Sequence, residues 1–501
     1  MSSCKSDINA DLLIINGIVY DGINSESKVI DIAIKDDKII YLGNNDSHSV
    51  TANQIIDAKD LIVSPGFIDP HTHSDRDLIN KKTSHNLPFL MQGITTVVVG
   101  NDGDSFYPTS DYKSLYNKQG IGTNVIMLVG HGTIRNKVLG NTNKKPTSEE
   151  LNLMKELIDQ EMNAGAFGMS TGLFYSPGSY SNTEEIISLA QVVSKNGGIY
   201  DTHLRDESNY NIGLISAVKE TIDIGLKANI PVHISHIKCL GRDVWHQSDS
   251  IIKLIEFYRN KGLSITANQY PYDASATSLK GAVVPRWAES GGKDSLFIRF
   301  NNNKLKLRIL SETSSNIFRR GGADKLLIVN SKNSDFIGKN LLELSEIFTK
   351  SPEETVYELI ESENIQVASF NMIEEDIINF MKQSWVFTGS DGNTGHPRKY
   401  GSFPKKYSEY VVNKKVLNLS KFIANSTSKP AEFFNVNKRG KIKEGYYADI
   451  IIFDPLYFKD KADYSNAFVY SEGLIYSIIN GELIIDKNNF TGQLKGKVLK
   501  K

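Results

Sequence analysis

The sequence predicts an α/β fold: a (β/α)8 TIM-type barrel with a small β-sandwich domain formed from both termini. The first observation is a series of eight short apolar runs, rich in β-branched residues, with amphipathic helical patterns between several of them. The second is that both ends of the chain read as short strands separated by turns. The third is a length of 501 residues, which exceeds what one compact core usually holds.

The two ends of the chain are predicted to form one β domain. Short strand patterns occupy 12–15, 18–20, 30–34, 39–42 and 55–57, and the same pattern returns at 448–452, 474–479 and 482–485. A long middle of different character separates them. We therefore assign residues 1–64 and 436–501 to the N-terminal and C-terminal parts of one small β sandwich.

The middle of the chain, residues 65–435, is predicted to be the barrel. Its helices are expected at 148–164, 183–194 and 211–226. The last two of its eight strands are about 115 residues apart, far beyond an ordinary crossover. We therefore expect an inserted subdomain, with several glycines, at about 280–345. The eight strands are expected at 66–70, 95–100, 124–129, 167–170, 198–202, 231–235, 264–268 and 385–388.

Charge and cysteine content exclude several classes of protein. The chain has 57 basic and 58 acidic residues, and this balance argues against a nucleic-acid partner. No apolar run approaches the roughly 20 residues of a membrane span, so we expect no transmembrane segment. Cys4 and Cys239 are the only cysteines, which excludes a disulfide framework and a cysteine-rich zinc site. The sequence does not predict the oligomeric state.

The N-terminal residues leave two locations open. Residues 1–7 contain no apolar stretch of the kind that a secretion signal needs, so we expect a cytoplasmic protein. The alternative is a periplasmic or membrane-anchored lipoprotein. In that case Ser2-Ser3-Cys4 would be the trimmed start of a longer precursor, with Cys4 as the lipidated residue.

Titratable residues follow the predicted strands at their carboxyl ends. His71 and His73 come after the first strand at i and i+2, and a strand directs such side chains to one side. Two imidazoles on one side are half of a metal site. Because the carboxyl ends of barrel strands meet at one rim, where catalytic groups lie, we expect this set to gather there: His71, His73, Asp102, His131, His203, His236, Lys238, Tyr270 and Asp391.

Each of these residues also has an ordinary structural interpretation. A single His73 or His203 is typical of a buried histidine with satisfied hydrogen bonds. Asp391 alone fits a loop or helix cap, and Asp102, within Asn-Asp-Gly, fits a turn. These separate interpretations do not explain why all of the residues lie at successive strand ends. Histidine and aspartate are zinc-type ligands, so the set predicts a catalytic metal site.

The chain resembles the amidohydrolase superfamily, and within it the N-acyl-D-amino-acid deacylases, or D-aminoacylases. The resemblance extends over nearly the whole chain. Its first and last segments are shared across the superfamily, and the middle ones are more specific to the deacylases. The segments that carry it are 65–73, 92–96, 165–173, 202–207, 234–238, 389–392, 430–431 and 440–449.

The resemblance implies a role for each matching residue. His71 and His73 would hold one metal with Asp391, and His203 and His236 would hold a second. Asp391 would also be the general base. The metal would be one or two Zn²⁺ ions, with another divalent metal as the alternative. Arg398 would bind the substrate carboxylate, with Lys238 and Tyr270 nearby. In the resulting mechanism the metal holds the oxyanion, with a tyrosine or His131 as a further contact.

Asp102 is the one departure from the family pattern. The family usually has a bridging cysteine in Gly-Asn-Cys-Gly, and this chain has Asp102 at that position. A carboxylate can bridge two metals, but it is a harder ligand than a thiolate and favours different metals. The departure bears on metal identity and occupancy more than on the reaction.

We therefore predict metal-dependent hydrolysis of the amide bond of N-acyl-D-amino acids, a small-molecule reaction. The first alternative is a dihydroorotase, hydantoinase or isoaspartyl dipeptidase type of hydrolase. The segment at the end of the fourth strand, Met169-Ser170-Thr171, has no lysine that could be carbamylated, which weighs against the hydantoinase type. The second alternative is a non-catalytic scaffold with the same fold, which should have lost its metal ligands.

Overall fold

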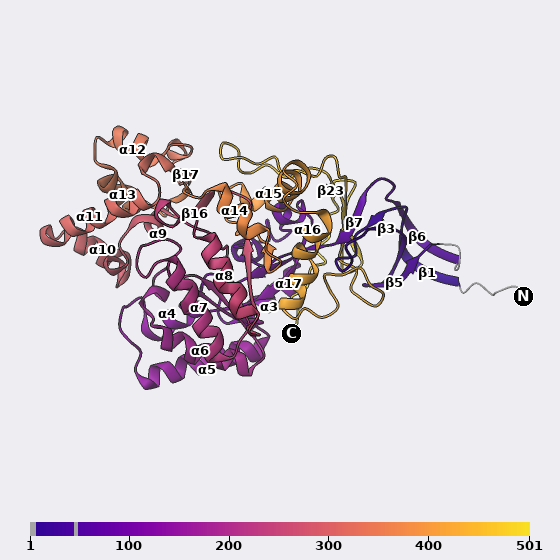
Figure 1. Ribbon diagram of the computed structural model, residues 1–501, viewed down its shortest axis with the longest axis horizontal. Helices are drawn as coiled ribbons and strands as arrows, with labels where there is room; N and C mark the ends of the chain where they lie inside the picture. Colours follow the sequence, from indigo (N-terminus) through magenta and orange to yellow (C-terminus); the bar gives the residue numbers. More distant parts are fainter. Residues whose placement is uncertain (1–6, 45–48) are drawn as a thin grey trace, which may run out of the picture.

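The computed structural model describes residues 7–44 and 49–501, so Cys4 lies outside the described residues. Three parts lie along the long axis of the molecule, with an inserted unit at one end, the barrel in the middle and the β domain at the other end (Figure 1). Within the described ranges, no helix combines the length and apolar character that crossing a membrane requires.

The predicted barrel is confirmed. Its strands run parallel in the orders β8-β9-β10 and β11-β12-β13-β14-β15-β19, and β10 and β11 are consecutive pieces of the third strand. A parallel bridge between Thr72 and Gly392 joins the first strand to the last. The strands are β8 (Phe67–Asp69), β9 (Ile94–Val99), β10 (Asn124–Met127), β11 (Val129–Gly130), β12 (Gly168–Gly172), β13 (Ile199–His203), β14 (Val232–Ile234), β15 (Ile265–Gln269) and β19 (Val386–Thr388).

Helices cover the outside of these strands and bury an apolar core against them. The predicted first helix, α5, is capped by Thr147, whose side chain accepts from the Glu150 N–H while Glu150 reaches back. The third predicted helix, α7, begins at Leu214 rather than at residue 211. The Asp206 carboxylate accepts from the backbone N–H groups of Ser208, Asn211 and Gly213 and holds this segment in a loop. The helices here are α1 (Asp75–Ile79), α2 (Leu87–Leu90), α3 (Thr109–Gln119), α4 (His131–Leu139), α5 (Ser148–Ala164), α6 (Thr183–Lys195), α7 (Leu214–Ala228), α8 (Ser248–Arg259), α14 (Glu374–Met381), α15 (Arg398–Lys405), α16 (Leu419–Ser426) and α17 (Ser428–Phe433), with short 3₁₀ turns η1 (Gly178–Tyr180) and η2 (Arg242–Val244).

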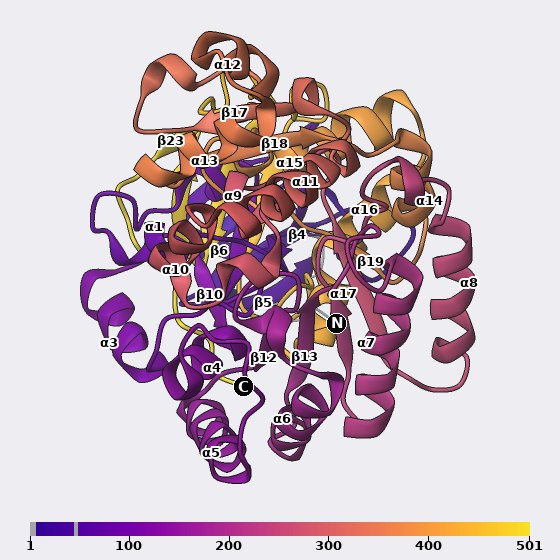
Figure 2. The same ribbon diagram turned by 90° about the vertical axis from the view of Figure 1, so that its left-hand side faces the viewer.

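The long connection between β15 and β19 forms a unit with its own sheet and core, seen from its own side in Figure 2. The predicted segment 280–345 lies inside this unit, which also includes the polar strand β16 before it and β18 after it. The antiparallel order is β16-β18-β17. Its elements are β16 (Ala274–Ser278), α9 (Leu279–Val283), η3 (Arg286–Glu289), α10 (Gly292–Phe300), α11 (Asn303–Arg319), η4 (Ala323–Lys325), β17 (Leu326–Asn330), η5 (Ser334–Phe336), α12 (Leu341–Phe348), α13 (Pro352–Ser362) and β18 (Gln366–Phe370).

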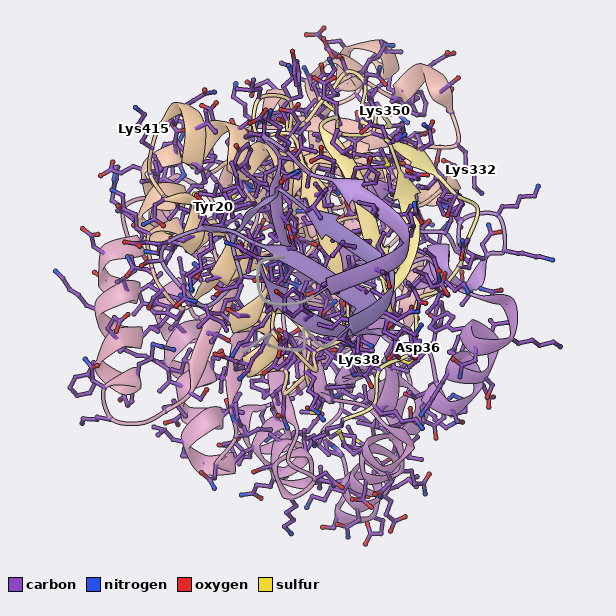
Figure 3. All side chains as sticks on the ribbon, turned by 90° about the vertical axis from the view of Figure 1, so that its right-hand side faces the viewer. Tyr20, Asp36, Lys38, Lys332, Lys350 and Lys415 are labelled. Atoms are coloured by element: carbon purple, nitrogen blue, oxygen red, sulfur yellow. The ribbon has the colours of Figure 1, made fainter. Side chains whose placement is uncertain are left out.

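Strands from both ends of the chain share one sheet, in the order β23-β22-β21-β20-β7-β2-β3, where β20 pairs antiparallel with β7. A second sheet, β5-β4-β1-β6, shares an apolar core with it. Figure 3 views this side, with Asp36 and Lys38 labelled near the β4–β5 turn. The strands are β1 (Asp7–Ile15), β2 (Ile18–Val19), β3 (Lys28–Val29), β4 (Asp31–Lys35), β5 (Lys38–Gly43), β6 (Ser49–Asp57), β7 (Ile62–Pro65), β20 (Ile450–Phe453), β21 (Leu474–Ile479), β22 (Glu482–Asp486) and β23 (Asn489–Phe490).

One buried lysine has no counter-charge. Pro404 removes an N–H donor within α15, and the helix continues as the π-helical segment η6 (Lys406–Asn413). Lys406, its first residue, is fully buried, and its Nζ has no hydrogen-bond partner in the part of the chain that the structure describes. Burial, with a contribution from Lys421, lowers the pKa of Lys406 to about 7.

We expect Lys406→Met to be more stable than the wild type by about 1–3 kcal/mol near pH 7, because it removes an unsatisfied buried amine. The folded pKa lies below the ordinary value of 10.5, so the part of the penalty that comes from the buried charge is full below about pH 7 and is lost as the pH rises toward 10.5. Urea unfolding at pH 7, 8.5 and 10 measures this. Lys415→Met, at an exposed lysine, is the control (Figure 3). A stability difference that does not change with pH would contradict the prediction.

Candidate metal centre

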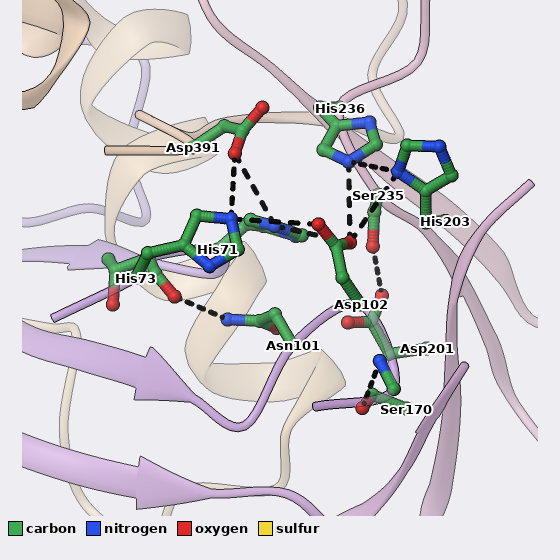
Figure 4. A network of polar contacts seen from close by, with 12 residues as sticks. His71, His73, Asn101, Asp102, Ser170, Asp201, His203, Ser235, His236 and Asp391 are labelled. Carbon is green, nitrogen blue, oxygen red and sulfur yellow. Dashed lines mark hydrogen bonds and ion pairs between the residues drawn. The ribbon is translucent and has the colours of Figure 1, made fainter. Parts of the chain in front are cut away.

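Four histidines and two aspartates meet at the carboxyl rim of the barrel (Figure 4). They come from five different strands. His71 and His73 follow β8, Asp102 follows β9, His203 ends β13, His236 follows β14 and Asp391 follows β19. The structure therefore brings together all six residues that the sequence indicates as metal ligands.

Asp102 lies in the middle of the four imidazoles. Its Oδ1 is 3.5 Å from His71 Nε2, 3.4 Å from His236 Nε2 and 3.7 Å from His203 Nδ1. Its Oδ2 is 3.6 Å from His73 Nε2. The alternative of a turn aspartate that points to solvent does not describe this position.

The loop that carries Asp102 is fixed on both sides. The Asn101 Nδ2 donates to the carbonyls of Thr72 and Val98, each at 3.0 Å, which ties the loop to the segment with His71 and His73. The backbone of Asp102 is left-handed, with φ 55°. At Gly103 a Cβ would lie 2.7 Å from the Gly172 nitrogen, so only glycine fits there.

Asp391 faces the cluster from the opposite side. Its Oδ1 is 3.1 Å from His73 Nε2 and 3.7 Å from His71 Nε2, and its Oδ2 is 2.8 Å from Arg398 Nη1. Burial by itself would raise the pKa of Asp391, but Arg398 and the neighbouring histidines outweigh it and hold the pKa well below its usual range. Asp391 is therefore a carboxylate at neutral pH.

The donor atoms fit a divalent metal. Ring nitrogens of His71 and His203 and Oδ1 of Asp102 are buried without hydrogen-bond partners among the described residues. His203 Nδ1 and His236 Nε2 are 3.0 Å apart, within hydrogen-bonding distance, and both lie within 3.7 Å of Asp102 Oδ1. Burial lowers the pKa of His71 to about 4, which keeps its imidazole neutral, the form that binds metals. Nitrogen and oxygen donors in this number suit Zn²⁺ and similar ions.

Two overlapping groups of potential ligands have donor atoms within 4.8 Å of one another. One consists of His71, Asp102, His236 and Asp391. The other consists of His203, His236 and Glu207, the last of which the sequence reading did not assign to a site. Glu207 Oε1 is 3.1 Å from His236 Nδ1 and 2.5 Å from Lys238 Nζ. The signal for it in the sequence was its place four residues after His203, in the loop that follows the same strand.

The predicted substrate-binding residues occupy different depths. Lys238 and Tyr270 line a cavity of about 1070 Å³ that also exposes His73, Asp102 and Asp391. Arg398 is fully buried behind this lining, between Asp391 and the Tyr270 ring, which is 4.7 Å from its guanidinium carbon. The Arg398 Nε and the Tyr270 hydroxyl are buried without hydrogen-bond partners in the described part of the chain.

His131 does not join this group. It begins α4, and its Nε2 lies 2.9 Å from Glu185, which also accepts from Arg135 at 3.1 Å. Its neighbour Gly132 lines the cavity, but His131 does not. The predicted oxyanion contact of His131 thus has no geometric support, because His131 is buried outside the cavity lining and its Nε2 is bonded to Glu185.

Comparison with known proteins gives one consistent result. Two models described as the amidohydrolase family match residues 54–231 and 341–484. A D-aminoacylase from Alcaligenes xylosoxydans xylosoxydans is 30% identical over 98% of this chain and 97% of its own. An N-acyl-D-glutamate deacylase from Bordetella bronchiseptica, solved with zinc and a phosphonate mimic of the tetrahedral intermediate, is 26% identical, covers 98% of this chain and 100% of its own, and has a TM-score of 0.85. A D-aminoacylase solved in a study of its binuclear metal centre is 29% identical, with the same coverage and a TM-score of 0.84.

We expect Asp102→Ala to bind less zinc than the wild type, with at most one ion per chain, because four imidazoles lose the carboxylate between them. Asp102→Cys should instead raise the zinc affinity, since a thiolate is the softer ligand. Metal analysis after dialysis and calorimetric titration of the metal-free protein measure both changes.

Asp104→Ala is the matched control for this prediction. Asp104 is an exposed aspartate of the same loop and has no ion pair with the histidines. Equal zinc binding by Asp102→Ala and Asp104→Ala, with both variants folded by circular dichroism, would refute the central position of Asp102 in the metal site.

Proposed function

The chain belongs to the amidohydrolase family, among the N-acyl-D-amino-acid deacylases, and from this we propose that it hydrolyses N-acyl-D-amino acids to a carboxylate and a free D-amino acid. One observation carries the proposal. The six His and Asp side chains (Figure 4) gather at a cavity that Lys238 and Tyr270 also line, and several of their own nitrogen and oxygen atoms have no hydrogen-bond partner among the described residues. Such a cavity suits a small anionic substrate.

We propose that the metal, one or two Zn²⁺ ions or another divalent ion, is held by residues of this cluster: His71, His73, Asp102, His203, His236 and Asp391. When bound, such a metal lowers the pKa of water and polarises the scissile carbonyl. The imidazoles would supply nitrogen donors, and Asp102 and Asp391 would supply the negative charge that offsets the cation. Glu207 orients His236 through Nδ1 and neutralises Lys238.

Asp391 is the proposed proton carrier. It lines the cavity beside His73 and is ionised at neutral pH, so it can accept a proton from the attacking water. The same carboxyl then returns the proton to the nitrogen of the leaving amine. Arg398 fixes its second oxygen at 2.8 Å, which directs Oδ1 toward the histidines.

The α-carboxylate of the substrate is proposed to lie against Lys238, Tyr270 and Arg398. Lys238 and Tyr270 reach the cavity, and their ammonium and ring centroid are 5.9 Å apart. The unpartnered Tyr270 hydroxyl and Arg398 Nε are donors that a carboxylate would satisfy. A guanidinium suits this role because its donors form a planar fork.

Two features favour this function over the alternatives. The strand β12 ends with Ser170, Thr171 and Gly172, so its end has no lysine to be carbamylated as in the hydantoinase type. A non-catalytic scaffold would have no need to keep buried donors unsatisfied around a cavity, which costs stability.

We expect the zinc-restored protein to hydrolyse N-acetyl-D-amino acids and to act little on the L-enantiomers, while the metal-stripped protein is inactive. Release of free amine from a panel of N-acetyl-D- and N-acetyl-L-amino acids measures this, with dihydroorotate, hydantoins and isoaspartyl dipeptides in the same panel. Turnover confined to the cyclic amides or the dipeptides would refute the proposal.

We expect Asp391→Asn to fold normally and to lose about 10²- to 10⁴-fold in kcat, since an amide cannot accept the proton. Asp104→Asn, another cavity-lining aspartate outside the ligand set, is the control. Measurement of kcat at equal zinc content separates proton transfer from metal loss. More than about a tenth of the wild-type rate would exclude Asp391 as the general base.

A further inference from the structure

Arg320 is a buried cation on the cavity wall without a carboxylate partner. It caps the C-terminal end of α11 in the inserted unit and is 2% exposed. Its Nε donates to the Tyr210 hydroxyl at 2.6 Å and its Nη1 to the Ser275 hydroxyl at 3.2 Å. Among the described residues, no carboxylate forms an ion pair with it, and Nη2 has no hydrogen bond.

The other two buried cations at this site are neutralised. Lys238 pairs with Glu207 at 2.5 Å, and Arg398 pairs with Asp391 at 2.8 Å. Arg320 has only neutral partners: the two hydroxyls and the rings of Phe174 and Tyr210, whose centroids are 5.9 and 5.7 Å from its guanidinium carbon. Hydroxyl and ring contacts offset part of the cost of burying a charge. The nearby Glu207 carboxylate acts on Arg320 electrostatically but is paired with Lys238, so Arg320 has no counterion in direct contact.

The position of Arg320 relates it to the reacting centre. The Phe174 ring beneath its guanidinium is 5.7 Å from the His203 ring, so one aromatic side chain separates Arg320 from the metal-binding histidines. Tyr175, the next residue, is 4.8 Å from His203 and lines the cavity together with Arg320. A substrate whose amide lies at the histidines can therefore reach Arg320 along this wall of the cavity.

We propose that Arg320 binds a second carboxylate of the substrate, so that the preferred substrates are N-acyl-D-amino acids with one carboxylate beyond the α-carboxylate. This inference rests on the proposed function and names its substrate class. The guanidinium offers its Nη atoms to a carboxylate, and the ion pair supplies the missing counterion. The second carboxylate belongs either to the amino-acid side chain or to the acyl group, and the chemistry at Arg320 is the same.

The test compares charged substrates with neutral substrates of similar shape. The ratio of kcat/KM for N-acetyl-D-glutamate over N-acetyl-D-glutamine reports a side-chain carboxylate. The ratio for N-succinyl-D-leucine over N-butanoyl-D-leucine reports an acyl carboxylate. We expect one of the two ratios to exceed 1 in the wild type and to fall about 10- to 100-fold in Arg320→Gln, as expected for a lost charge-assisted hydrogen bond. Arg320→Lys should restore part of it.

Arg319→Gln is the matched control. Arg319 precedes Arg320 in α11, but it donates to Asn209 and does not line the cavity. Both ratios should be unchanged in this variant. Turnover with both wild-type ratios at or below 1, or with ratios unchanged in Arg320→Gln, would overturn the inference and leave the proposed function standing. If Arg320→Gln does not fold, wild-type ratios at or below 1 still overturn the inference. No turnover of any N-acyl-D-amino acid would instead refute the proposed function, and the inference with it.

Discussion

The contact between the first and eighth barrel strands fixes the site. Buried Asp69 accepts from the N–H groups of His71 and Ser390, at 3.2 and 3.0 Å. Next to it, the Asp391 N–H donates to the His71 carbonyl at 2.9 Å, and the His73 N–H donates to the Gly392 carbonyl at 3.2 Å. Residues more than 300 positions apart in the chain are thereby held in register. Without this closure, the proposed proton carrier Asp391 and the histidines that it faces would not be held at fixed positions relative to each other.

The site also concentrates features that cost stability. Asp102, His236 and Asp391 all have left-handed backbones, with φ of 55°, 33° and 47°. Such conformations persist for non-glycine residues only where surrounding contacts enforce them, and they aim side chains in directions that ordinary strand ends do not allow. His236, for example, is held by its N–H bond to the Asn268 side chain on the next strand. Packing of the barrel core offsets the cost of these backbone conformations.

The barrel and the inserted unit differ in whether the cations that they place at the cavity are paired with a carboxylate. The barrel positions Lys238 and Arg398, and each of them already has a carboxylate partner. The inserted unit contributes Arg320, which has none. Because the proposed reacting groups all lie at the ends of barrel strands, a change of substrate preference through the insertion would not require those groups to move. This separation of chemistry from selectivity is typical of barrels whose loops carry the specificity.

The sequence by itself determined the barrel and the candidate ligand set. Buried parallel strands are continuous apolar runs, and the histidines and aspartates directly follow them, so both could be found along the chain. Only the tertiary structure decided how charged groups are paired. It placed His131 against Glu185, Arg398 behind Asp391, and Glu207 between His236 and Lys238. It also extended the insertion to β16 and β18 and brought Arg320 to the cavity. Pairing of this kind joins residues from distant segments, and local sequence patterns do not indicate which distant side chains will be in contact.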